Sequence, residues 1–311
     1  MYTKKISVVL LNYKGAEDTI ACLNSLQKVN YPSLNIIIVD NASPDNSLQQ
    51  IEKYILTEGM SYQYFQSIKD AANARVRKYV TLIQSDTNNG YGHGNNIGIK
   101  YALDTDADYV LVLNNDTIVE PDFLIPMVEM CEGNPAIGIA SCKINFHDNP
   151  DRIWFHGGEL TPFFSKVVHF NFNEKDDGQV KKKDSTFISG CLWLIPRKVF
   201  LDVGYINEDY FMYVEDLEYC HRVLKKGYTL KVCEASQIYH KAGSSSGGHE
   251  SEFSVYWSAK NYIKFINEHC LVPMNILAFV NVIFIQSLRW VWFRKPKLLY
   301  VHLKGIFNGF F

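Results

Sequence analysis

The sequence contains few of the patterns that identify common protein classes. Its seven cysteines are odd in number, scattered, and never spaced as Cys-x-x-Cys, so neither a disulfide framework nor a zinc site is indicated, and reduced cytosolic thiols are the simple interpretation. Neither G-x-G-x-x-G nor G-x-x-x-x-G-K-[ST] occurs, which gives no support for a dinucleotide site or a P-loop. We find no internal repeat. The first apolar run, Ile6–Leu11, is too short for a signal peptide and fits a first strand better.

The chain also lacks an overall basic excess. Its net charge is −2, but residues 260–311 carry seven Lys or Arg against one acid, Glu268, which is a balance of +6 and leaves about −8 for the remainder. An acidic body argues against a nucleic-acid partner. A basic and apolar C-terminal segment is suited to an anionic membrane surface.

The content of 47% apolar and 21% charged residues is that of a globular protein, and 311 residues suffice for one large domain or two ordinary ones. In the first 140 residues, apolar strands alternate with helical patterns. Strands are predicted at Ile6–Leu11, 34–40, 79–86 and 107–116. Strands separated by helices predict an α/β fold with a mostly parallel central sheet that helices flank.

The second half of the sequence is less regular. Residues 141–185 lose the alternation and are compatible with antiparallel strands, after which a buried strand (185–196), an amphipathic helix (211–227) and an alternating strand (228–240) are predicted. A Gly/Ser-rich break follows at 241–251. We therefore expect one domain over residues 1–250 and a helical tail over 251–311.

The tail contains an apolar stretch, residues 271–293, that is long enough to span a bilayer. Polar and helix-breaking residues interrupt it, and Trp290 and Trp292 precede the basic sequence RKPK as interfacial anchors. An in-plane amphipathic helix is favoured over a spanning one. A helix docked on the first domain or on a second subunit is the alternative. The interrupting residues are Pro273, Asn275, Asn281, Gln286 and Arg289.

Polar clusters follow several predicted strands or begin helices: Asp40, residues 88–96, residues 114–116, and the pair Glu215 and Asp216. Because parallel strands end on one edge of a sheet, the first three are expected to converge across a crevice. Each cluster alone is equally compatible with an ordinary turn or helix N-cap.

Six segments together resemble family-2 glycosyltransferases, in particular bacterial rhamnosyltransferase-like members. In order they are SVVLLNYKG, VDNASPDNS, NNGYGHGNNIG, LNNDTIVEP, ISGCLWLIPRKVFLDVGYINEDYFMYVEDLEYCHR and YHKAGSS. The resemblance covers about residues 5–245, and HLKGIFNGFF resembles the C-terminus of that group. It implies a GT-A (nucleotide-diphospho-sugar transferase) fold in residues 1–250 and an inverting sugar transfer from a nucleotide-diphospho donor.

The resemblance also assigns nucleotide-binding positions. Tyr13 and Asp40 correspond to residues that hold the base and ribose, and a carboxylate at a strand end accepts hydrogen bonds from such groups. Where many relatives carry an arginine, this chain has Asn95, which puts direct charge pairing with the diphosphate there in doubt. The remaining positions assigned to the nucleotide are Asn88, Gly90 and Asn115.

The sequence NND at 114–116 stands in place of the DxD motif of the family, so Asp116 is its only carboxylate. One aspartate and a diphosphate suffice in principle for Mg²⁺ or Mn²⁺, since Mg²⁺ takes only one or two carboxylates. His240 matches a further metal ligand of some relatives, and an imidazole would favour Mn²⁺. A structural role for this histidine is the alternative.

For catalysis, the resemblance assigns Asp216 as the base that deprotonates the acceptor hydroxyl, with Glu215 shaping its environment or contacting the acceptor. Acidic residues at a helix start also favour the helix dipole, which is compatible with this role. Ser189 and Gly190 are expected near the donor sugar. Trp154 is a candidate for stacking on a sugar, as are His156 and Trp193, although aromatic residues in such segments are more often core.

The expected function is transfer from dTDP-rhamnose or a UDP-hexose to a saccharide or lipid-linked acceptor, in the synthesis of cell-surface polysaccharide or lipopolysaccharide. The enzyme is expected in the cytoplasm, peripheral on the inner face of the cell membrane. One alternative is a sugar-nucleotide-forming nucleotidyltransferase, which needs a basic glycine-rich N-terminal loop where LNYKGAED has one lysine. The other is a non-catalytic scaffold that binds sugar nucleotides, against which Asp116 and Asp216 argue.

Overall fold

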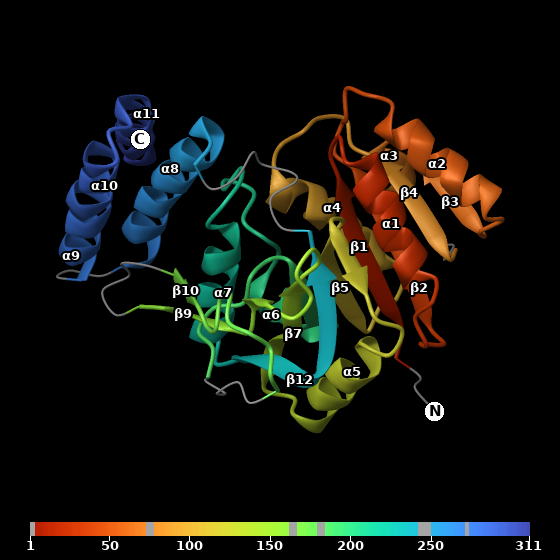
Figure 1. The fold of residues 1–311 in the computed structure, drawn as a ribbon. Helices are drawn as coiled ribbons and strands as arrows, with labels where there is room; N and C mark the ends of the chain where they lie inside the picture. The colour runs from red at the N-terminus through yellow and green to blue at the C-terminus, as the bar shows by residue number, and fades with distance from the viewer. Residues whose placement is uncertain (1–3, 73–77, 162–166, 179–183, 242–249, 271–273) are drawn as a thin grey trace.

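A computed structural model describes residues 4–72, 78–161, 167–178, 184–241, 250–270 and 274–311. Its centre is one large mixed sheet with helices packed around it (Figure 1). In spatial order, the strands are β3 (Tyr62–Phe65), β4 (Val80–Gln84), β2 (Leu34–Asp40), β1 (Ile6–Asn12), β5 (Tyr109–Asn114), β11 (Leu192–Pro196), β7 (Ile137–Phe146), β12 (Thr229–His240) and β6 (Thr117–Val119), and β8 (Ile153–Phe155) pairs with β7. The predicted α/β fold class is confirmed.

The N-terminal half of the sheet is parallel throughout, from β3 to β5. Its inner strands are runs of Ile, Val and Leu that are fully buried, as expected when helices cover both faces of a parallel sheet. The register pairs Asn12 with Asp40 and Leu11 with Asn114, so that these strands end at the same level. The convergence predicted from the strand ends is therefore present. Strand β3, a partly exposed edge strand, was not expected from the sequence.

The other half of the sheet is mixed. Strand β11 runs antiparallel to both β5 and β7, whereas β12 runs parallel to β7 with a register shift between Cys233 and Gln237. The short strand β6 then pairs antiparallel with the end of β12, and Thr117 lies opposite His240. This pairing joins the segment after β5 to the last strand of the sheet. A small second sheet contains β9 (Gly158–Leu160) and β10 (Val167–His169), which are antiparallel, as residues 141–185 suggested.

Helices lie between the strands along the first 225 residues. Helix α4 packs against β1, β2 and β5, and α5 packs against β7 and β12. Helix α7 starts at residue 215 rather than at the predicted 211, because residues 213 and 214 have left-handed backbone conformations. These helices are α1 (Ala16–Leu26), α2 (Ser47–Thr57), α3 (Ile68–Ala72), α4 (Tyr91–Asp104), α5 (Leu124–Gly133), α6 (Arg197–Val203) and α7 (Glu215–Lys225).

The C-terminal helices gather at one end of the molecule, next to α7 and far from α2 (Figure 1). They are α8 (Glu252–His269), α9 (Met274–Val280), a π-helical turn (Asn281–Ile285), α10 (Gln286–Trp292) and α11 (Pro296–Gly309). Helix α8 contributes Ala259, Ile263 and Phe265 to the main hydrophobic core, so it is packed on the body of the protein. The boundary at residue 250 stays a prediction. Most of the predicted break at 241–251, and Pro273, lie outside the described residues.

The apolar stretch 271–293 is helical over most of the residues that the structure describes. No helix in the described part of the chain combines the length and the apolar character needed to cross a bilayer. Polar residues divide the stretch as the sequence suggested, and the π-helical turn begins at Asn281, one of these interrupting residues.

Candidate active site

Asp40 lies at the end of β2 within a network of hydrogen bonds from its own chain. Asn12 Nδ2 donates to Asp40 Oδ2 at 2.7 Å, and the backbone N and hydroxyl of Ser43 donate to the carboxylate at 2.9 and 2.8 Å. The residue is 1% exposed. Tyr13, in contrast, is 44% exposed immediately after β1. The structure thus places Tyr13 as the accessible group at this edge and Asp40 as the group that fixes the turn around it.

The glycine-rich turn before α4 contacts the segment that leads to the predicted catalytic acids. Gly90 has φ of +96°, and a Cβ built there would lie 2.0 Å from the carbonyl oxygen of Phe211, so only glycine fits. The next amide, Tyr91 N, donates to the same Phe211 carbonyl at 2.9 Å. Asn88 Oδ1 accepts from Gly90 N and from Asn41 Nδ2, each at 3.0 Å. The turn therefore fixes Phe211 as well as the start of α4.

The two remaining asparagines assigned to the nucleotide use part of their hydrogen-bonding capacity within the fold. Asn95 is buried and donates to the carbonyl oxygen of Tyr91 at 3.0 Å. Asn115 Nδ2 donates to Thr19 Oγ1 at 2.8 Å, which ties the end of β5 to α1. Their contacts with a nucleotide stay predictions.

Asp116 and His240, which are 124 positions apart in the sequence, form a buried pair. His240 Nε2 lies 3.1 Å from Asp116 Oδ1, because β6 and β12 pair in the register that opposes Thr117 and His240. The Nδ1 atom of His240 is buried and has no hydrogen-bond partner among the described residues. Trp154 packs edge-on against the imidazole, with ring centroids 4.2 Å apart.

This pair fits two neighbouring ligands of one divalent cation. Metal bonds of about 2.1 Å at a right angle place two ligand atoms about 3.0 Å apart, close to the observed separation of 3.1 Å. A carboxylate oxygen and an imidazole nitrogen are donors that Mn²⁺ accepts. In the described part of the chain, no group of three or more His, Cys, Asp or Glu side chains forms a metal cluster. The remaining ligands would come from a diphosphate and water.

Glu215 and Asp216 occupy the first turn of α7. Asp216 Oδ2 accepts from Gly190 N at 3.3 Å and Oδ1 from Leu217 N at 2.8 Å. Burial raises the pKa of Asp216 to about 6 despite these hydrogen bonds. Burial, and secondly the charge of Asp216, hold the pKa of Glu215 well above its usual value, and Glu215 Oε2 has no partner among the residues that the structure describes. Burial therefore disfavours the charged form of both carboxylic acids.

Tyr91 is a site residue that the sequence analysis did not select. Its hydroxyl donates to the carbonyl oxygen of Gly190 at 2.7 Å and lies 3.4 Å from Asn114 Oδ1. Burial raises its pKa, and the charges of Glu215, Asp216 and Asp116 raise it further. Tyr91 thus lies among the acids Glu215 and Asp216 of α7 and Asp116, which follows β5. The sequence signal that could have identified Tyr91 is its position as an aromatic residue inside a glycine-rich turn.

The expected donor-sugar positions differ in their surroundings. A Cβ at Gly190 would lie 3.3 Å from the Tyr91 hydroxyl and 3.5 Å from Asp216 Cβ, so glycine keeps the space beside these groups open. Ser189 is buried next to it. Trp193 is fully buried and stacks on Tyr219, which makes it a core residue, as the alternative interpretation held.

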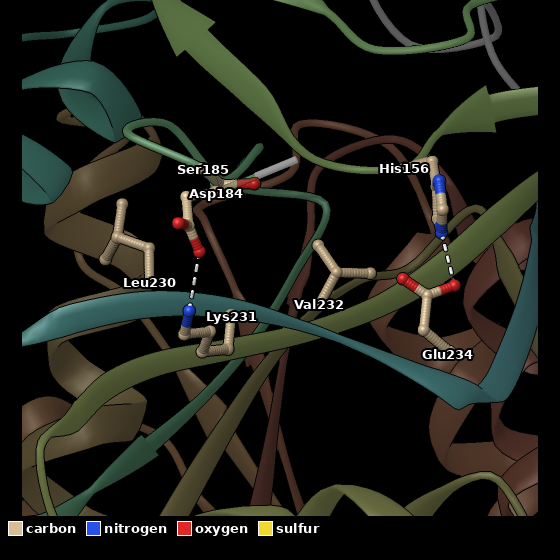
Figure 2. A pocket seen from close by; sticks show the side chains of 7 residues that line it. All are labelled: His156, Asp184, Ser185, Leu230, Lys231, Val232 and Glu234. Carbon is tan, nitrogen blue, oxygen red and sulfur yellow. Dashed lines mark hydrogen bonds and ion pairs between the residues drawn. The ribbon is translucent and has the colours of Figure 1, made fainter. Parts of the chain in front are cut away.

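A cavity of about 260 Å³ lies elsewhere, along the first half of β12 (Figure 2). A hydrogen bond and an ion pair flank it: His156 Nε2 lies 2.7 Å from Glu234 Oε2, and Lys231 Nζ lies 2.8 Å from Asp184 Oδ1. These residues of β12 precede His240 by six or more positions, which at about 3.3 Å per residue is roughly 20 Å along the strand. His156 therefore faces this cavity and not the Asp116–His240 pair. Besides these four residues, Ser185, Leu230 and Val232 line it.

Comparison with known sequences identifies the family of the chain. Residues 7–204 match the family described as "Glycosyl transferase family 2", which is more than half of the sequence. The chain belongs to glycosyl transferase family 2. Residues 109–308 of this glycosyltransferase also match "Glycosyl transferase family group 2", so the family likeness extends into the C-terminal helices.

The curated relatives of the glycosyltransferase include a hexosyltransferase, a polysaccharide synthase and a rhamnosyltransferase. The low-salt glycan biosynthesis hexosyltransferase Agl10 of Haloferax volcanii is 24% identical over 264 residues, covering 82% of this chain and 73% of the relative. The poly-β-1,6-N-acetyl-D-glucosamine synthase of Staphylococcus epidermidis is 24% identical, covering 98% and 69%. The rhamnosyltransferase WbbL of Escherichia coli is 25% identical over 187 residues, covering 57% and 70%.

Solved structures establish the fold of the glycosyltransferase. The mannosyltransferase PcManGT of Pyrobaculum calidifontis, in complex with GDP-Man and Mn²⁺, aligns with a TM-score of 0.59 at 15% identity and covers 98% of this chain and 74% of its own. GalNAc-T7, with UDP, GalNAc and Mn²⁺, aligns with a TM-score of 0.60 at 14% identity, covering 85% and 48%. The predicted GT-A fold is confirmed.

Proposed function

We propose that this glycosyltransferase moves a sugar from a nucleotide-diphospho donor, dTDP-rhamnose or a UDP-hexose, to a saccharide or lipid-linked acceptor with inversion. Its role would be in the synthesis of cell-surface polysaccharide or lipopolysaccharide. The observation that carries the proposal is the pair Glu215 and Asp216, whose pKa values are raised by burial beside the Gly190 backbone. Relatives that make glycans, including a rhamnosyltransferase, support the substrate class.

In the proposed reaction, Asp216 accepts the proton of the acceptor hydroxyl. The acceptor oxygen forms a bond to the anomeric carbon as the bond from that carbon to the diphosphate oxygen breaks, and the nucleoside diphosphate leaves. A single displacement inverts the anomeric centre and needs one base, so no second carboxylate nucleophile is required. In its protonated form, which burial and the charge of Asp216 favour, Glu215 would donate a hydrogen bond to the acceptor. Tyr91 and Gly190 border the space in which these groups meet.

We further propose that Asp116 and His240 hold a divalent cation, Mn²⁺ or Mg²⁺. When bound, the cation would stabilise the charge that develops on the leaving diphosphate. The separation of 3.1 Å between Asp116 Oδ1 and His240 Nε2 supports this assignment. The imidazole favours Mn²⁺, which both structural neighbours contain.

The nucleotide would lie along the edge where β1, β2 and α4 meet. Tyr13 is accessible there for stacking on the base, and Asp40 with Asn88 would approach the ribose and base. The amide oxygens of Asn95 and Asn115 would accept hydrogen bonds from the nucleotide. Trp154, packed on His240, would contact the donor sugar or the acceptor.

The outer face of the C-terminal helices supports a peripheral position on the cytoplasmic face of the membrane. Large apolar side chains are exposed along it, and Trp292 is 83% exposed. Such a patch marks an interaction surface on a protein, and basic residues near it add attraction to anionic lipid. Some of these bases already pair with acids, as Arg289 does with Glu250. The exposed side chains include Ile276, Leu277, Phe284, Ile285, Leu288, Val291 and Phe307.

Thermal shift with a panel of nucleotide sugars tests the proposal, because a ligand that binds the folded state raises its apparent stability. We expect one nucleotide-sugar class to raise Tm in the presence of Mn²⁺ and to lose most of this effect in excess EDTA. A rise that EDTA leaves unchanged would remove Asp116 and His240 from the ligand set. The absence of any rise, together with no release of nucleoside diphosphate, would contradict the proposed function.

For the membrane proposal, flotation with vesicles of phosphatidylglycerol and phosphatidylethanolamine compares the wild type with Trp292→Ser/Leu288→Ser. We expect the wild type to float and the variant to remain largely at the bottom. If the wild type and the variant float to the same extent, the apolar face would instead be assigned to a protein partner.

A further inference from the structure

The turn before the acidic pair has an unusual backbone. Tyr213 and Val214 have φ values of +67° and +72°, in the left-handed region that residues with a side chain rarely adopt. For a β-branched residue such as Val214 this conformation is an outlier that persists only when the surroundings enforce it. Glu215 and Asp216 follow directly. The side chain of Val214, at the N-cap of α7, makes no capping hydrogen bond, so the turn itself sets where that helix begins.

A side chain from α8 holds this turn. Asn261 is 0% exposed, and its Nδ2 group donates to the carbonyl oxygens of Met212 and Tyr213, both at 2.9 Å. An amide nitrogen has two hydrogens, and here both serve consecutive carbonyls of the strained turn. The contact joins residues 48 and 49 positions apart.

Helix α8 is well placed to hold the turn because it is itself fixed on both sides. Toward the turn, the ring of Trp257 stacks on Phe211, with centroids 4.7 Å apart. On its other side α11 approaches closely: a Cβ at Gly305 or at Gly309 would lie 2.5 Å from a backbone carbonyl oxygen of α8. The tight packing of α11 therefore leaves α8 little freedom to move away from the turn.

We propose that Asn261 is a positioning residue for the transfer reaction, which holds the left-handed turn so that α7 presents Asp216 beside Gly190. The proposal rests on the proposed role of Asp216 as the base. It assigns a function in the active site to a helix that lies beyond the segment in which the catalytic motifs occur. It follows that the C-terminal helices contribute to the geometry of the site as well as to an outer surface.

The experiment replaces Asn261 by leucine, which is similar in size and has no donors, in the full chain. Because a displacement of about 1 Å can cost roughly 100-fold in rate, we expect kcat to fall by about 10- to 100-fold. We expect KM for the donor to change by less than about threefold, since the nucleotide edge is built from other elements. Ser254→Ala is the matched control: it removes a contact from α8 to the Tyr213 hydroxyl, at 3.1 Å, and leaves the carbonyls alone.

A second substitution separates positioning from simple destabilisation. Val214→Gly removes the strain of the left-handed conformation at residue 214, because glycine adopts it freely, and leaves Tyr213 as it is. We expect Asn261→Leu/Val214→Gly to recover a substantial part of the lost kcat, and to fold even if Asn261→Leu alone does not. If Asn261→Leu costs the same kcat with and without Val214→Gly, or if the double variant fails to fold, the proposal is overturned.

Amide hydrogen exchange provides a readout that does not need turnover. In Asn261→Leu, exchange of residues 212–218 should accelerate at least about tenfold while exchange of β1 stays unchanged. Unchanged exchange at 212–218 would overturn the positioning role whatever the activity. If the wild type turns over no nucleotide sugar but exchange responds as expected, the proposed function fails and the structural part of this inference holds.

Discussion

Asp216→Asn should stabilise the protein while removing its proposed base. Burial raises the pKa of Asp216 from 3.8 to about 6, so the folded state disfavours the ionised form relative to the unfolded chain. The raised pKa of Asp216 therefore stabilises the folded state fully below pH 3.8, where the residue is neutral. This stabilisation is lost as the pH rises through 6 and Asp216 ionises. Asparagine cannot ionise and avoids this loss.

The magnitude follows from linkage between protonation and folding. With pKa values of 3.8 and about 6, ionisation of Asp216 costs about 1.6 kcal/mol at pH 5 and about 3 kcal/mol at pH 8. Both are upper values, because Asp216 is only partly buried and solvent screens its charge. Asparagine has a single oxygen, so it can accept only one of the hydrogen bonds from Gly190 N and Leu217 N, and losing the other removes about 1 kcal/mol of this gain. The net gain at pH 8 is then about 2 kcal/mol.

Urea denaturation of wild type and Asp216→Asn at pH 5 and pH 8 measures this effect. The stabilisation should be larger at pH 8 than at pH 5 by about 1.4 kcal/mol, a difference on which the lost hydrogen bonds have little influence. Glu218→Gln, two residues along the same helix, is the matched control with the opposite sign. Burial opposes ionisation of Glu218, but Arg222 donates hydrogen bonds to both of its carboxylate oxygens and the pKa of Glu218 is lowered. Removing this carboxylate should therefore destabilise the protein by about 3 kcal/mol. An Asp216→Asn variant that is equally or less stable at both pH values would refute the reasoning.

Three further substitutions test other parts of the structure. Gly90→Ala should lower the free energy of unfolding by about 2–5 kcal/mol in urea melts, because its Cβ would meet the Phe211 carbonyl; a loss below about 0.5 kcal/mol would contradict this close approach. His240→Ala should raise the Mn²⁺ concentration for half-maximal activity at least about tenfold, and an unchanged requirement would exclude ligation. Gly305→Leu should lower the free energy of unfolding in urea melts by about 2 kcal/mol or more, because it forces α11 away from α8. Leu303→Ala, at an exposed position of the same helix, should change it by about 0.5 kcal/mol or less. Equal effects of the two substitutions would contradict the close packing of α11 on α8.

The parallel half of the sheet could be predicted from sequence because each of its inner strands is marked by its own short run of residues. Runs such as residues 6–11 and 34–40 are apolar without alternation, and the polar residues that follow them, including Asp40, mark the edge where they end. The motifs then pointed to Asp116 and Asp216 as the acids of the site. Strand β3 was missed because its sequence, YQYF, is only four residues long and stays partly exposed, so it forms no apolar run.

The contacts that assemble the site depend on pairing across long sequence distances. Nothing local to β6 specifies that it joins β12, yet this pairing brings Asp116 to His240. Likewise, periodicity in residues 211–227 suggested one helix, because a left-handed conformation at Val214 leaves no trace in an apolar pattern. In the sequence, Asn261 looks like any polar residue on the exposed face of an amphipathic helix. The folded chain shows that it is buried.

The most direct test of the central claim is turnover by wild type and Asp216→Asn at pH 7.5 with Mn²⁺. Release of nucleoside diphosphate and formation of the glycosylated acceptor are measured with the donor that the thermal-shift panel selects. We expect the substitution to lower kcat at least about 100-fold, the scale of a general base, while donor binding and folding are retained. A variant that keeps turnover within a few-fold of the wild type would contradict the assignment of Asp216 as the base.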